Sequence, residues 1–181
     1  MRRPYPGSRW SVQVIWTVVI FSSLVILPTG AIAESPAPSN PEVILQAIER
    51  EGAAAVVTRL KNDPHEWKHV LEQIEQGSTR WLKVGLAMRP GTGVGTRHPL
   101  DVALYSALPN NPGQVLRWIG HGVSLDDVCS VPRAEWDRAQ ARGYLARAKK
   151  ALKKPLPEEI EPIRVQCIRH LDKVTARLQQ Y

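Results

Sequence analysis

The stretch DPHEWKHVLEQIEQG, residues 63–77, has the pattern of a capped helix, and NPGQVLRWIGHG, residues 111–122, has the same pattern. In both, an Asp or Asn suited to an N-cap precedes Pro, which is favoured at the first helical position. Glu66 and Gln114 stand third after the cap, as a capping box requires. Downstream, Val, Leu, Ile and Gly recur at an offset of 45 residues. We therefore expect two similar helical hairpins within one globule.

Helical signals continue on both sides of this stretch. Asn40 and Pro41 repeat the start signal, and Gly52 either ends that first helix or interrupts a longer one. Apolar residues recur at spacings of three and four in three further segments, 79–88, 100–108 and 160–178. No run of alternating apolar residues bounded by turn residues indicates a strand. The sequence predicts an all-α fold, a compact single domain of stacked helical hairpins over residues 41–181.

Residues 1–33 have the three parts of a secretory signal peptide. A start with three arginines precedes an apolar run over 12–27, and Ala31-Ile32-Ala33 is a small-x-small cleavage site. We expect cleavage after Ala33, a flexible Pro/Ser-rich linker over 34–40, and a periplasmic or secreted protein. The alternative is an uncleaved segment, residues 12–27, that anchors the chain in the inner membrane.

The chain has two cysteines, Cys129 and Cys167, and both follow the predicted signal peptide. A pair of cysteines in an exported chain predicts one disulfide. Closing a loop of this length would stabilise the fold by roughly 3 to 4 kcal/mol in the chain-entropy model. Two buried free thiols are the alternative to a disulfide.

The charge of the chain is modest once the signal peptide is set aside. Residues 1–33 hold three of the 24 basic residues and no acidic one, which leaves 21 basic against 17 acidic residues, a net charge of +4. This small excess does not indicate a nucleic-acid-binding protein.

Much of the positive charge lies in residues 133–154, which we expect to form one polar helix. Glu135 and Asp137 are its acidic residues. The basic ones are Arg133, Arg138, Arg142, Arg147, Lys149, Lys150, Lys153 and Lys154. Such a run is typical of a solvated helix face, and contact with an anionic membrane surface or an acidic partner protein is the alternative.

His65-Glu66-x-x-His69 matches the pattern of zinc peptidases. On a helix the two imidazoles would lie on one face and could bind zinc, while Glu66 activated a bound water. Against this, Pro64 confines His65 to the first helical turn, and Glu66 already fits the capping box. The next predicted helix, 79–88, contains no Asp, Glu or His as a third ligand. We therefore predict no catalytic, cofactor-binding or metal-binding residue.

The run WLKVGLAMRPGTG at 81–93, the Leu-rich segment 104–108, Asn111-Pro112 and the segment VCSVP at 128–132 resemble an uncharacterised group of small secreted bacterial all-helical proteins. The similarity covers about residues 70–132 and the later single cysteine. An acidic residue often stands in the Pro-Gly-Thr loop of that group, where this chain has Gly93. The resemblance implies export and an all-helical fold, and it supplies no activity or site residue.

Together these features predict an exported, non-enzymatic helical protein that binds another macromolecule, as an envelope adaptor or a toxin-neutralising immunity protein does. The expected partner is another protein of the cell envelope, and the basic run at 133–154 could also contact an anionic membrane surface. We expect no cofactor and no nucleic acid. The alternative function is a small zinc-dependent hydrolase that uses His65, Glu66 and His69.

Overall fold

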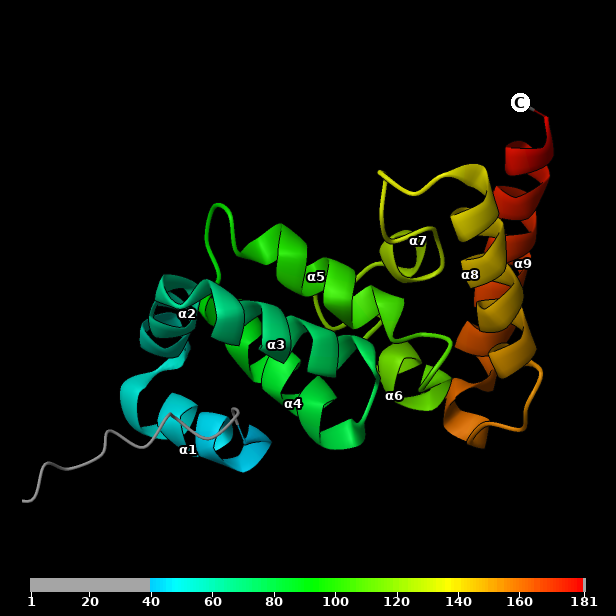
Figure 1. Ribbon diagram of the computed structural model, residues 1–181. Coiled ribbons are helices and arrows are strands. Elements are labelled where there is room, and N and C mark those ends of the chain that lie inside the picture. The colour runs from blue at the N-terminus through cyan, green and yellow to red at the C-terminus, as the bar shows by residue number, and fades with distance from the viewer. Residues whose placement is uncertain (1–39, 181) are drawn as a thin grey trace, which may run out of the picture. The chain divides into compact units, whose positions relative to one another are not determined.

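The computed structural model describes residues 40–180 (Figure 1). Over this range the chain forms nine α-helices, two short 3-10 helices and no strand, apart from one isolated bridge between Ile119 and Val123. The predicted all-α fold is therefore confirmed. The predicted signal peptide, the alternative anchor at 12–27 and residues 34–39 of the predicted linker lie outside the described residues.

The helices follow one another with short connections. They are α1 (Pro41–Glu51), α2 (Ala53–Asn62), α3 (Pro64–Glu75), α4 (Thr79–Met88), η1 (Arg89–Gly91), α5 (Arg97–Ser106), α6 (Pro112–Leu116), α7 (Leu125–Val128), α8 (Arg138–Leu152), η2 (Glu158–Ile160) and α9 (Glu161–Gln179).

The three predicted Asx-Pro start signals each begin a helix. The side chain of Asn40 accepts a hydrogen bond from the N–H of Glu42 at 2.9 Å, and that of Asn111 accepts one from Gln114 at 3.3 Å. Asp63 caps α3 in the same way. Between α1 and α2, Gly52 has a φ of 84°, a conformation that favours glycine, so it ends the first helix.

The first five helices pack closely around α3 and α4. Helix α3 contacts α2, α4 and α5, while α1 lies against α2 and α4 (Figure 1). The approach of α4 to α5 depends on Gly85, because a Cβ there would lie 2.7 Å from Cδ2 of the buried Leu104. The largest fully buried side chains of α2 to α6 are Leu60, Ile74, Leu82, Met88, Leu100, Leu104 and Leu116.

Helices α8 and α9 lie side by side and join the same hydrophobic core. Helix α6 contacts both α4 and α8. The hydroxyl of Tyr144 in α8 donates to the carbonyl oxygen of Tyr105 in α5 at 3.0 Å. The predicted disulfide is present: it joins Cys129, directly after α7, to Cys167 in α9 with a Cα–Cα distance of 5.3 Å.

The structure differs from the sequence prediction in two segments. The segments starting at Asp63 and Asn111 begin alike, but α3 has 12 residues and α6 has only 5. The segment that starts at Asn111 leaves the helix after Leu116 and turns through Gly120 and Gly122, which both have a positive φ.

The basic helix was predicted from residue 133, and this start is wrong. Helix α8 begins at Arg138, because Asp137 and Gln140 form a reciprocal capping box that fixes its first turn. Arg133 lies before the helix and pairs with Glu75 of α3. The basic residues that follow Asp137 still share one helical element and its final turn.

Candidate functional site

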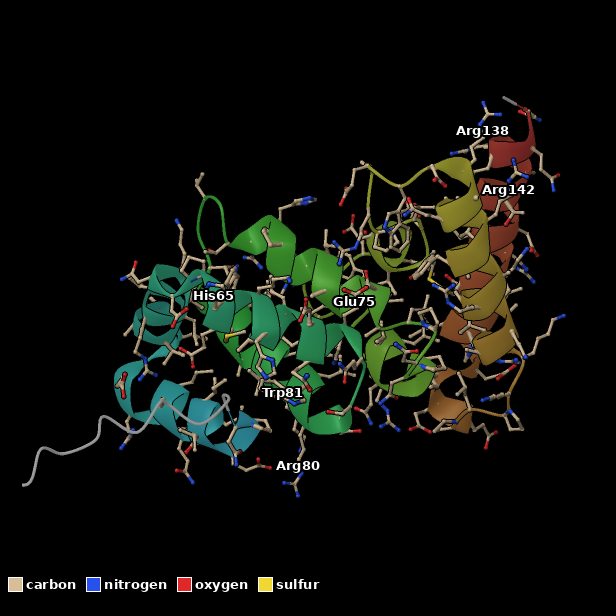
Figure 2. All side chains as sticks on the ribbon, in the orientation of Figure 1. His65, Glu75, Arg80, Trp81, Arg138 and Arg142 are labelled. Carbon is tan, nitrogen blue, oxygen red and sulfur yellow. A yellow bond between two sulfur atoms is a disulfide. The ribbon has the colours of Figure 1, made fainter. Side chains whose placement is uncertain are left out.

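The motif His65-Glu66-x-x-His69 occupies the first turns of α3. The Asp63 carboxylate accepts the backbone N–H groups of His65 and Glu66 at 3.0 and 3.1 Å, so the motif contains the capped helix start. His65 is exposed, whereas the ring of His69 meets the ring of Trp81 edge-on, with 6.3 Å between centroids. Figure 2 shows His65 near the start of α3 and Trp81 on α4. His69 therefore contributes to the packing of α3 on α4.

Within residues 40–180, no group of three or more His, Cys, Asp or Glu side chains is arranged to hold a metal ion.

A second polar cluster connects the end of α4 to α5. Nε of Arg89 donates to Asp101 at 2.7 Å, and Nη1 donates to the carbonyl oxygen of Gly122 at 2.7 Å. The side chains of Arg89 and Asp101 are only 16% and 17% exposed, and their hydrogen bond raises the pKa of the guanidinium. Burial and the charge of Asp101 also raise the pKa of Tyr105. Since each charge is compensated, the cluster fixes the chain turn around Gly122 rather than presenting a free charge.

Helix α8 presents the opposite situation. It contains no acidic residue from Arg138 to Leu152. Its buried side consists of Ala141, Tyr144, Leu145, Ala148, Ala151 and Leu152. Its solvent side and the turn that follows Leu152 carry six exposed basic side chains, which we call the basic face: Arg138, Arg142, Arg147, Lys150, Lys153 and Lys154. Figure 2 shows Arg138 and Arg142 on the first turns of this helix.

Few of these charges are neutralised. None of the six side chains of the basic face forms an ion pair with a carboxylate of the described residues, whereas Lys149 pairs with Asp172 at 3.2 Å. Some exposed cations elsewhere do have partners, as in Arg117–Glu159 and Lys68–Glu72, whereas Arg169, Lys173 and Arg177 of α9 form no ion pair within the described residues. Like charges four residues apart, as at Arg138 and Arg142, destabilise a helix by roughly 0.2 to 0.5 kcal/mol per pair. This cost falls on the first turns of α8, whereas the basic residues in its last turn interact favourably with the helix dipole.

Two recesses border Arg147 on this helix. One, of about 250 Å³, lies against the turn after α5 and is lined by Pro109, Asn110, Arg147, Lys150, Ala151 and Lys154. The other, also of about 250 Å³, is lined by Trp136, Ala139, Gln140, Gly143 and Arg147. The sequence indicated the basic run, but not the approach of the turn at Pro109, which depends on the tertiary fold. We take the basic face with these recesses as the candidate functional site.

Comparisons with protein families, with characterised proteins and with solved structures found no match to this chain. Among the helices between residues 40 and 180, none combines the length and the apolar character that crossing a membrane requires.

Proposed function

We propose that this protein is exported, is not an enzyme, and acts by binding another protein of the cell envelope, as an adaptor or immunity-type protein would. The observation that carries the proposal is the basic face of α8, whose six cations have no carboxylate partner within residues 40–180. Charges left free by the fold are available to a partner, and complementary charge speeds association and selects among partners.

Export is supported by the disulfide between Cys129 and Cys167. Such bonds form and persist in oxidising compartments, the bacterial periplasm among them, and are rare in the cytosol. The signal-peptide pattern of residues 1–33, with cleavage after Ala33, belongs to the same proposal.

The competing function is a zinc-dependent hydrolase using His65, Glu66 and His69. Its motif has the required spacing, but its backbone N–H groups bind the Asp63 cap and its second imidazole lies against Trp81. A zinc site needs both imidazoles held toward one metal by the surrounding packing. These contacts favour a structural use of the motif.

A capture experiment tests the proposal. Immobilised protein is incubated with envelope extract beside a variant in which all six residues of the basic face are changed to Gln. We expect one envelope protein to bind the wild type but not the variant. The variant lacks both the long-range electrostatic attraction and the charges that would form ion pairs at the interface. No capture by the wild type contradicts the binding function, and equal capture by both proteins contradicts the role of the basic face in it.

Metal analysis of the same purified protein tests the competing function. Stoichiometric zinc that is lost in His69→Ala would favour the hydrolase, because His69 is one of the two imidazole ligands that the motif supplies. We expect neither zinc in the wild type nor any change on this substitution.

A further inference from the structure

We propose that the part of the basic face around Arg147, together with the turn at Pro109–Asn110, binds an acidic segment of the partner protein. The segment carries clustered Asp or Glu side chains next to one apolar side chain. This inference rests on the proposed function and adds to it the location of the contact and the chemistry of the partner.

Three cations are brought to one recess by the end of α8 and the turn after it. Arg147 and Lys150 are three residues apart and so lie on one side of α8, while Lys154 lies in the turn that follows, where its backbone N–H donates to Ala151 at 3.2 Å. All three line the recess of about 250 Å³, and all three are exposed. Several carboxylates in one partner segment would match this arrangement, since each cation lacks an acidic partner of its own within the described chain.

The wall opposite these cations is held in place by the fold. Nδ2 of Asn110 donates to the carbonyl oxygen of Glu75 at 3.0 Å, and its backbone N–H donates to Ala107 at 2.9 Å. Pro109 and the buried Ala151 add apolar surface to the same recess. Ion pairs formed beside apolar walls are less screened by water and salt than those on an open surface. A carboxylate that enters the recess is therefore attracted more strongly than one on an open helix.

The size of the recess favours a side chain over a small molecule. Small-molecule and cofactor sites occupy roughly 300 to 1,000 Å³, and this recess is smaller, at about 250 Å³. It suits one or two side chains of a longer segment that continues across the surface.

The second recess indicates where the apolar side chain of the segment would lie. Arg147 borders both recesses, so a segment that crosses Arg147 reaches Trp136 on the other side. The Trp136 ring is supported by Tyr144, with 5.4 Å between centroids, and Arg133 lies 5.8 Å from its centre. A partly buried, supported Trp beside exposed Arg is the residue combination found at interface hot spots.

A membrane surface fits this face less well. Among the described residues, the exposed large apolar side chains are Val43 and Val94, and neither lies on α8. The apolar side of α8 is buried within the domain, so this helix has no apolar face to insert between lipids. Contact with a membrane would depend on electrostatic attraction alone, whereas the recesses also allow shape complementarity with a partner protein.

The test uses a short fluorescein-labelled peptide with clustered Glu and one Leu, and measures its binding to purified protein by fluorescence anisotropy. The site variant is Arg147→Gln/Lys150→Gln/Lys154→Gln. The matched control is Arg169→Gln/Lys173→Gln/Arg177→Gln, which removes the same charge from exposed positions of α9. We expect the site variant to bind the peptide about tenfold more weakly than the wild type. The affinity of the control should fall by less than about twofold, because three surface ion pairs are lost only at the site.

Three outcomes would overturn the inference. One is an equal loss of affinity in both variants, which would show that net charge alone attracts the peptide. Another is no change in the site variant. The third is binding of phosphatidylglycerol vesicles that the site variant abolishes while peptide binding is absent, which would assign the face to lipid. Circular dichroism and thermal unfolding confirm that both variants are folded.

The capture experiment separates this inference from the function on which it rests. If the site variant captures the same envelope protein as the wild type, the docking site is wrong and the binding function stands. If the wild type captures nothing, the function itself fails. A charge-reversed variant, Arg147→Glu/Lys150→Glu/Lys154→Glu, should bind a peptide with Lys in place of Glu, a gain that damage to the fold cannot produce.

Discussion

Helices α4 and α9 are held in the fold by different means. Five of the 10 residues of α4 are buried, including Trp81, Leu82 and Met88, whereas only Cys167 and Leu171 are buried among the 19 of α9. Packing on several neighbours holds α4, while α9 depends on the disulfide, on α8 and on polar contacts such as Lys149–Asp172. Helix formation alone therefore does not fix a helix in place, and each of these two should respond to a different perturbation.

Removing the disulfide should produce the largest difference between the two helices. The cysteines are 38 residues apart, and opening a loop of this size is expected to cost about 4 kcal/mol, or a fall in Tm of roughly 10 °C. In Cys129→Ser/Cys167→Ser, hydrogen exchange should show the amides of α9 losing protection before those of α4. The wild type under reducing conditions serves as the control and should match the variant. Equal loss in both helices would contradict the comparison.

Adding a methyl group should reveal the packing of α4. In Gly85→Ala the new Cβ would lie 2.7 Å from Cδ2 of Leu104 and 3.3 Å from Cδ1 of Ile74, both buried. We expect a loss of about 1 to 3 kcal/mol in the free energy of unfolding, measured by urea denaturation.

The matched substitution on α8 is expected to have the opposite sign. In Gly143→Ala the nearest atom is Nη1 of Arg147 at 3.6 Å, an ordinary contact with a flexible side chain. The change should stabilise the protein by about 0.5 to 1 kcal/mol, because Ala loses less conformational entropy in a helix than Gly. Destabilisation by both substitutions would show that α8 is packed as tightly as α4.

Much of the fold could be predicted because its signals are local. Asn40 and Asp63 cap the helices that their sequence patterns predicted, Gly52 adopts a positive φ, and the Cys pair forms its bond. The start of α8 was missed although Asp137 and Gln140 carry a local capping signal, because the basic run extends across them. The shortness of α6 had no local signal, since its apolar pattern continues past Leu116.

The candidate site was predictable only in part. The sequence showed the excess of positive charge, but which cations lack partners depends on contacts between distant segments, such as Arg133 with Glu75 and Lys149 with Asp172. The recess depends on the approach of Pro109 to Arg147. Likewise, His69 fits a zinc motif in sequence, and only the fold places its ring against Trp81.

A further expected effect concerns the hydrogen bond that connects α8 to the first five helices. The buried Tyr144 hydroxyl donates to the carbonyl oxygen of Tyr105, and Tyr144→Phe should cost about 1 kcal/mol near neutral pH. Burial raises the pKa of Tyr144 well above its usual value of 10.0. Above about pH 10 the unfolded chain therefore binds fewer protons than the folded one, and stability falls as pH rises.

The pH dependence separates this contact from ordinary packing. The Phe variant lacks the titrating group, so its stability should fall less steeply above about pH 10. The difference in the free energy of unfolding between the two proteins should therefore narrow. A residual slope should persist, because burial also raises the pKa of Tyr105. Urea denaturation from neutral to alkaline pH measures both slopes. Parallel curves for the two proteins would mean that Tyr144 ionises as freely in the folded protein as in the unfolded chain, and that α8 is held less tightly than its hydrogen bond indicates.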